Sequence, residues 1–267
     1  MHTTDPYYLL LALIVSIVAG AMNSIAGGGT LLTFPMLIWM GLDGKVANAT
    51  STVGLWAGSL GGAWGYRQEV ASSGSLFWPF FLSSLAGGVV GSLLFLHTER
   101  GLFNFLVPWL ILIATSLFAS QSLIRRMMGK KGETHFTPSR WPLVAVIQFL
   151  VGAYGGYFGA GMGILMLAIL TFLGISTIHR MNAIKNIAAT IINGVTIILF
   201  MIYSRFSPHL VQIDWMVAVA MVIGACIGGY GCAGLARKLP VAVVHAIVII
   251  IGGMGALFTA YKAWFAS

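Results

Sequence analysis

The sequence predicts an all-α polytopic membrane protein made of two inverted repeats, each with a glycine-broken short helix plus spanning helices. Of its 267 residues, 58% are hydrophobic and only 7% are charged, whereas a water-soluble domain carries roughly 25% charged residues. The mean hydropathy is +0.94, and apolar runs long enough to span a bilayer recur from Tyr7 onward. Because these runs are long and continuous, we expect helices and not a barrel of short alternating strands.

The order of elements is repeated along the chain. A glycine-rich segment at 25–35 has a counterpart at 158–166, and each is followed by a short apolar run. Each copy continues with a helix that begins with Asn-Ala and then with two further apolar helices. These further helices are expected at about 74–97, 101–123, 212–236 and 239–264. We expect a first membrane repeat at 1–123, a basic cytoplasmic linker at 124–140 and a second membrane repeat at 141–267.

Glycines interrupt the apolar sequence at matching positions of the two copies. Glycine breaks helices or permits close backbone approach, and the run after each cluster is shorter than the ~20 residues that span a bilayer. Such segments in two halves of one chain indicate a transporter binding site, although glycines also pack helices together. Three consecutive glycines exceed what packing requires. We therefore expect a substrate-binding role for Gly27, Gly28, Gly29, Thr30, Gly159, Gly161 and Gly163.

The net charge of +8 is explained by basic loops, so we expect no nucleic-acid partner. If the linker lies inside and each glycine-broken unit returns to its starting side, most basic residues lie inside, as the positive-inside rule requires. Each half then has an odd number of segments, so the copies are inverted in the membrane. Besides the linker, the inner set is Arg67, Arg180, Arg237 and Lys238, and the outer set is Lys45, Arg100, Arg205 and Lys262.

The helix after each short run carries a polar stripe. With about 100° of rotation per helical residue, polar residues of the second copy share one face: Asn182, Lys185, Asn186 and Asn193. The same spacing in the first copy places Asn48, Ser51, Thr52 and Ser59 on one face. A stripe of this kind must face protein or water, because exposing it to hydrocarbon is costly. One interpretation is that the stripe joins helices by interhelical hydrogen bonds, each of which stabilises the fold by ~0.6 kcal/mol. The other is that the stripe binds a substrate.

Lys185 gives the stripe a charge. A lysine one turn into an apolar helix costs free energy unless it snorkels to the interface, pairs with another group or meets an anion. Its position near the helix start leaves snorkelling, structural pairing and a substrate role open.

The remaining groups suit a small anion. The N-termini of the two short helices would present unpaired amides and the positive end of the helix dipole, with Thr33 as a plausible N-cap before Pro35. Six carboxylates are present in the chain, all expected at terminal, loop or helix-end positions: Asp5, Asp43, Glu69, Glu99, Glu133 and Asp214. The sequence predicts substrate-binding residues but no catalytic residue, metal ligand or cofactor.

These motifs resemble the TauE/SafE family of sulfite exporters. The resemblance rests on the break Ala26-Gly27-Gly28-Gly29-Thr30 with its following Pro35, on the helix start Ala47-Asn48-Ala49-Thr50-Ser51 and on their second-half counterparts. It covers nearly the whole chain, but Lys185 stands where a small hydroxyl residue is more usual. The resemblance implies a multi-pass protein of the cell inner membrane that transports sulfur-containing anions such as sulfite, thiosulfate, sulfoacetate or other organosulfonates.

Two other functions remain open. One is a carrier or passive pathway for a non-sulfur anion such as a carboxylate. The other is an intramembrane enzyme, which needs a nucleophile with its base or a metal cluster, and the sequence has no His-Glu-x-x-His or Gly-x-Ser-x-Gly motif. We therefore expect a transporter, not an enzyme, whose partners are the lipid bilayer and a small anionic substrate. Homo-oligomerisation is left open.

Overall fold

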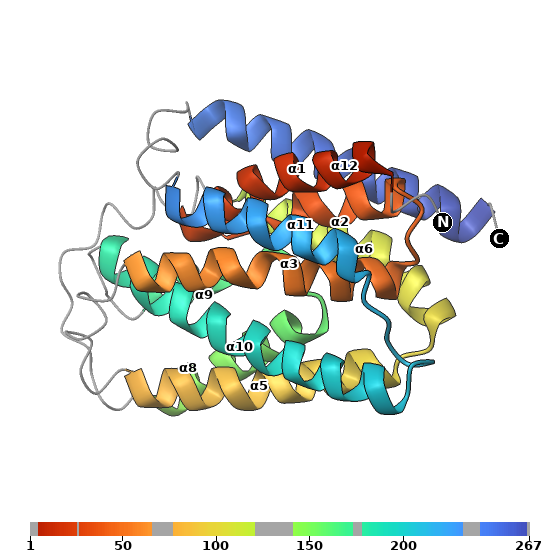
Figure 1. Ribbon diagram of the computed structural model, residues 1–267. Helices are drawn as coiled ribbons and strands as arrows, with labels where there is room; N and C mark the ends of the chain where they lie inside the picture. Colours follow the sequence, from red (N-terminus) through yellow and green to blue (C-terminus); the bar gives the residue numbers. More distant parts are fainter. Residues whose placement is uncertain are drawn as a thin grey trace.

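A computed structural model describes residues 5–25, 27–65, 77–120, 141–172, 178–231 and 241–265. This part of the chain forms a bundle of helices that lie along one common direction (Figure 1). The helices are α1 (Pro6–Ile25), α2 (Thr30–Trp39), α3 (Gly44–Gly65), α5 (Phe77–His97), α6 (Arg100–Ala119), α8 (Trp141–Tyr157), α9 (Met162–Phe172), α10 (Ile178–Phe206), α11 (Trp215–Cys226), the π-helical turn η3 (Ile227–Gly231) and α12 (Val241–Phe265).

The all-α polytopic prediction is confirmed. Within the described residues, four helices are long and apolar enough to cross a membrane, namely α1, α5, α6 and α10. Large apolar side chains face outward along the bundle, such as Leu10 and Leu112, as expected where lipid is the solvent. The expected basic linker at 124–140 lies outside the described residues, as do Arg67, Arg237 and Lys238.

The first glycine break reverses the chain. Gly27 and Gly28 have φ angles of +75° and +108°, which glycine adopts without steric cost. The following short helix, α2, runs back along α1, because the ring of Trp39 at its end packs edge-on against Tyr8 near the start of α1, with centroids 6.2 Å apart. The expected N-cap at Thr33 is wrong. The N-cap residue is Gly29 without a side-chain cap, since the reversal at Gly27 and Gly28 lets the helix begin at Thr30, one turn earlier.

Close glycine contacts set the direction of one group of helices. Leu13 lies against Gly224 and Ala21 against Gly228, so α1 runs parallel to α11 and η3. Gly54 faces Met221 and Gly61 faces Tyr230, so α3 also runs parallel to this helix. With no side chain at these positions, the helix backbones approach closely, which is how helices associate in a bilayer. The first group therefore consists of α1, α3 and α11.

A second group is arranged in the same way. Gln148 Nε2 donates to Ser84 Oγ at 2.8 Å, and a Cβ on Gly156 would lie 3.0 Å from the Ser92 hydroxyl, so α5 runs parallel to α8. Ser92 and Thr196 share a hydroxyl hydrogen bond of 2.7 Å, and Gly88 lies on Ile192, so α5 also runs parallel to α10. The second group consists of α5, α8 and α10.

The two groups meet at α3 and α10, which run antiparallel. Trp56 Nε1 donates to Thr190 O at 2.9 Å, while Gly62, later in α3, faces Asn186, earlier in α10. If the repeat order is followed, α1, α3 and α11 correspond to α8, α10 and α5. Equivalent helices thus lie in opposite groups and point in opposite directions (Figure 1). How the two halves are oriented in a membrane remains a prediction.

We expect single cysteines placed near Lys45 and near Arg180 to be labelled from opposite sides of the membrane. Lys45 is at the start of α3 and Arg180 at the start of α10, and these helices run in opposite directions. The measurement is labelling by an impermeant thiol reagent in oriented vesicles, in a background that lacks Cys226 and Cys232. A cysteine at Glu99 is the control and should label with the Lys45 side, because Lys45 Nζ donates to Thr98 O at 2.8 Å. Labelling of the Lys45 and Arg180 positions from one side would exclude the inversion.

Candidate substrate-binding site

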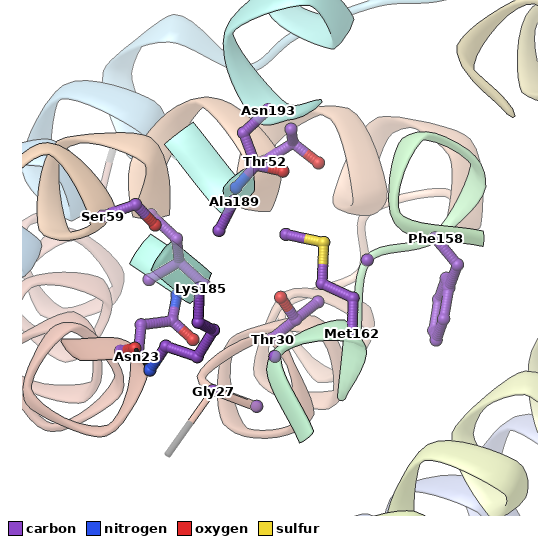
Figure 2. A pocket seen from close by; sticks show the side chains of 14 residues that line it. Asn23, Gly27, Thr30, Thr52, Ser59, Phe158, Met162, Lys185, Ala189 and Asn193 are labelled. Atoms are coloured by element: carbon purple, nitrogen blue, oxygen red, sulfur yellow. Dashed lines mark hydrogen bonds between the residues drawn. The ribbon is translucent and has the colours of Figure 1, made fainter. Parts of the chain in front are cut away.

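A small cavity lies between the two glycine breaks and the middle of α3 and α10 (Figure 2). Its volume is about 20 Å³, which is room for roughly one water molecule. Both halves of the chain contribute to its wall. The lining residues are Asn23, Gly27, Gly28 and Thr30 around the first break, Thr52, Leu55 and Ser59 on α3, Phe158, Gly159, Met162 and Gly163 around the second break, and Lys185, Ala189 and Asn193 on α10.

The two breaks have related geometry and touch each other. Gly27 and Gly159 have φ angles of +75° and +78°, and each N–H donates to a carbonyl five residues earlier, at 3.1 Å and 3.2 Å. A Cβ on Gly27 would lie 2.7 Å from Gly163 Cα. The start of α2 at Thr30 and the start of α9 at Met162 therefore both meet the cavity, and the positive ends of two helix dipoles face it.

Lys185 closes the carbonyl end of α1. Its Nζ donates to Asn23 O at 3.0 Å and to Ser24 O at 3.3 Å, and Asn186 Nδ2 donates to Ser24 O at 3.2 Å. The last carbonyls of a helix have no partner within the helix and carry partial negative charge. Hydrogen-bond donors at this position therefore pair carbonyl oxygens that would otherwise be unsatisfied. The Lys185 side chain is only 1% exposed. Lys185 therefore does not snorkel to the interface but pairs inside the protein, at the wall of the cavity.

The first half repeats this arrangement with a neutral donor. Asn48 Nδ2, at the start of α3, donates to Tyr157 O at the end of α8 at 3.1 Å. The α3 helix thus closes the carbonyl end of α8, and α10 closes that of α1. The polar stripe of each half stabilises the broken helix of the other half.

The other stripe residues divide between packing and the cavity. Ser51 is fully buried, and its hydroxyl is 2.7 Å from that of Thr33 on α2, so it joins two helices. Thr52 lines the cavity while its hydroxyl donates to Asn48 O at 2.8 Å. Among the described residues, the buried Oδ1 atoms of Asn48 and Asn182 accept no hydrogen bond, and these two residues occupy equivalent positions of the two copies.

The structure thus separates the expected binding residues into two sets. The cavity is lined by Gly27, Gly28, Thr30, Thr52, Gly159, Gly163, Lys185 and Asn193. Gly29, Asn48, Ser51, Gly161, Asn182 and Asn186 lie outside its lining. Of the second set, Gly29 donates its N–H to Asn23 Oδ1 at 2.8 Å, so this amide at the start of α2 is already bonded.

Sequence reasoning missed several lining residues. Asn23 lies in α1, outside the repeated stripe, although an amide in an apolar helix four residues before a glycine cluster is itself a signal. Phe158 and Met162 flank the second break, and nothing in a single apolar residue distinguishes a cavity wall from a core. Both residues line the cavity because the second break turns the chain between α8 and α9.

The lining offers hydrogen-bond donors and no carboxylate. Lys185, Asn23 and Ser59 lie on one side of the cavity, with Met162 opposite them and Thr52 and Asn193 along another edge (Figure 2). Ammonium, amide and hydroxyl groups form charge-assisted or neutral hydrogen bonds to an oxyanion, and no acidic side chain in the lining would repel it. The cavity is chemically suited to a small anion.

The sequence matches the family of the sulfite exporter TauE/SafE over residues 12–259. The chain belongs to this family. It is similar to a probable membrane transporter protein of Haemophilus influenzae, with 26% identity over 96% of this chain and 97% of the relative. It is also 29% identical to the probable membrane transporter protein ORF9 of Sinorhizobium, over 92% of each chain. Identity to the probable membrane transporter protein YfcA of Escherichia coli is 24%, over 95% of this chain and 90% of the relative.

Membership in the TauE/SafE family confirms the resemblance found from the glycine and Asn-Ala motifs. The match extends over both glycine breaks and both polar stripes. Together with the apolar helices of the bundle, it makes the chain a multi-pass membrane transporter.

Gly27→Ala should impair transport strongly, because the new methyl group would collide with Gly163 Cα. Overpacking of this kind costs ~1–3 kcal/mol, and an alanine at φ +75° adds a penalty of similar size. Transport is measured in proteoliposomes. Gly41→Ala is the matched control, since Gly41 also has a positive φ of +91° but a Cβ there has no atom within 4 Å. Equal transport by the two variants would show that contact between the breaks is unimportant.

Proposed function

We propose that this TauE/SafE protein carries a small sulfur-containing anion, such as sulfite, thiosulfate, sulfoacetate or another organosulfonate, across the cell inner membrane. The observation that carries the proposal is the buried ammonium of Lys185 at a cavity between the two halves, with amides and hydroxyls around it and no carboxylate in the lining. The description of the matching family names sulfite export, and this supports sulfur in the substrate.

The location of the cavity supports a carrier mechanism. The cavity is enclosed by the two breaks, which touch at Gly27 and Gly163, and by the antiparallel pair α3 and α10. Because its volume of about 20 Å³ holds roughly one water molecule, an oxyanion with several heavy atoms enters only when the helices or their side chains shift. We propose that the two groups of helices, which meet at α3 and α10, rock about this contact and expose the cavity to one side at a time.

The sidedness follows from the distribution of charge. The end of the bundle where α3, α6 and α11 begin and α10 ends holds three basic residues, Lys45, Arg100 and Arg205. The opposite end, where α6 ends and α8 and α10 begin, holds Arg180, and the sequence that joins α6 to α8 contains five further Lys and Arg residues. By the positive-inside rule, we propose that the Arg180 end faces the cytoplasm.

The second candidate substrate is a non-sulfur anion such as a carboxylate. Lysine, asparagine, serine and threonine donors recognise any oxyanion, and the lining holds no group that is selective for sulfur. A passive anion pathway would use the same cavity.

Sulfur-containing anions should compete best for transport. The measurement is uptake of labelled sulfite into proteoliposomes, with thiosulfate, sulfoacetate, acetate and chloride as competitors at matched ionic strength. We expect thiosulfate or sulfoacetate to reduce sulfite uptake at least ~10-fold more effectively than acetate, which is a difference of ~1.4 kcal/mol. Stronger competition by acetate would favour the carboxylate carrier.

Lys185→Ala should weaken anion binding by more than tenfold, or ~1.4 kcal/mol, because the cavity loses its ammonium. Binding is titrated on purified protein in a choline salt, without Na⁺ or K⁺, and folding is checked by thermal unfolding in the same detergent. Lys45→Ala is the matched control. Lys45 is also buried and donates to carbonyls at the end of α5, at 3.1 Å to Leu96 O and 2.8 Å to Thr98 O, but it does not line the cavity. Unchanged affinity in a folded Lys185→Ala protein would remove this ammonium from the anion site.

A further inference from the structure

We propose that the ammonium of Lys185 is a tethered cation, held where a carrier with broken helices would bind a free cation beside its substrate. The protein then binds its anion without a dissolved cation, and removal of Lys185 makes anion binding dependent on Na⁺ or K⁺. The effect of Lys185 on anion binding rests on the proposed function. The replacement of a free cation by the Lys185 ammonium rests only on the contacts between Lys185 and the carbonyl end of α1.

The ligands of Lys185 are of the kind that binds free cations. Main-chain carbonyl oxygens at the C-terminal ends of broken membrane helices coordinate Na⁺ in secondary transporters, and rings of carbonyls replace the hydration shell of K⁺ in channels. Here the carbonyl oxygens of Asn23 and Ser24, directly before the glycine break of α1, accept hydrogen bonds from Lys185 Nζ at 3.0 Å and 3.3 Å. The ammonium thus lies on oxygens suited to a metal cation.

The position is rigid and enclosed. Asn186 Nδ2 donates to Ser24 O at 3.2 Å, and Gly29 N–H donates to Asn23 Oδ1 at 2.8 Å, so both residues that supply the carbonyls are also held by other groups. Lys185 is 1% exposed and lines the cavity together with Asn23 (Figure 2). A helix C-terminus carries about half a negative charge. The ammonium therefore lies against the negative end of α1, at the wall of the cavity.

The repeat shows that closing a carbonyl end does not itself require a charge. At the equivalent end of α8, the neutral amide of Asn48 donates to Tyr157 O at 3.1 Å. The position equivalent to Lys185 in the first copy is Ser51, whose hydroxyl bonds to Thr33. Hydrogen bonding alone therefore does not account for a buried lysine in the second copy, because a buried charge is costly in a membrane. A role for the charge accounts for it.

The test compares two variants in salts of Na⁺, K⁺ and choline with one common anion. Lys185→Ala vacates the space of the ammonium, and Lys185→Met fills it without charge. The first measurement is thermal unfolding of the purified proteins without substrate. A ligand that binds the folded state raises Tm, and the increase grows with the logarithm of the ligand concentration once this exceeds Kd. We expect Na⁺ or K⁺, but not choline, to raise the Tm of Lys185→Ala increasingly with concentration. The Tm of the wild type and of Lys185→Met should be the same in all three salts.

The second measurement is sulfite binding in the same salts. We expect Lys185→Ala to bind sulfite at least ~10-fold more tightly in Na⁺ or K⁺ than in choline, whereas binding by the wild type and by the Lys45→Ala control is the same in all three salts. If Lys185→Ala does not fold, Lys185→Ser, which copies the first half of the chain, takes its place.

The outcomes separate the two proposals. An identical Tm of the alanine or serine variant in Na⁺, K⁺ and choline would overturn the tethered cation. Cation-dependent stability of that variant, together with no sulfite binding by the wild type, would support the tethered cation and overturn sulfite as the substrate. Cation-dependent stability with cation-independent sulfite binding would overturn the link between the cation and the anion.

Discussion

The hydrogen bonds that close the carbonyl ends of α1 and α8 hold the centre of this protein together. A helix that stops inside a bilayer leaves its last carbonyls without partners, and no water is available there to satisfy them. The donors come from the opposite half of the chain, from Lys185 and Asn186 for α1 and from Asn48 for α8. Each half thus supplies hydrogen-bond donors to the broken helix of the other half, so the two halves depend on each other.

This mutual dependence explains where the cavity forms. Two short helices begin where two long ones end, so the breaks bring four helix ends and the glycine contact between Gly27 and Gly163 to the same region. Side chains cannot fill that region completely, because glycine has none. Of the polar residues that donate to the broken helices, Lys185 also lines the remaining space. On the stripe of α10, Asn186 donates to the end of α1, whereas Asn193 lines the cavity.

Close backbone contacts are the second constraint. In lipid, helices gain little from hiding apolar side chains and associate through tight packing of small residues. The α5–α8 contact uses Gly88 and Gly156, and the α1–α11 contact uses Gly20 and Gly224. Each of these pairs joins one half to the other. The halves are consequently interleaved and do not form two separate bundles, so the cavity lies inside a single packed structure.

The sequence alone was sufficient for the helical membrane class, the order of elements and the two glycine breaks, because these depend on local composition and on repetition. The same local reasoning placed the N-cap of α2 at Thr33, which was wrong because the reversal at Gly27 and Gly28 starts the helix earlier. The polar stripe was also visible as a face of a helix. Which of its members line the cavity was not visible, since helical periodicity fixes the face of a residue but not its depth or its partner.

Only the tertiary structure decided that Lys185 pairs with α1 instead of snorkelling, that Asn48 binds the end of α8, and that Asn23 joins the cavity wall. These contacts join residues more than a hundred positions apart in the sequence for Asn48 and Lys185. Composition and periodicity describe what each helix presents on its own faces. Which residues contact a given face depends on how helices from the two halves cross. That crossing depends on all of the glycine contacts together.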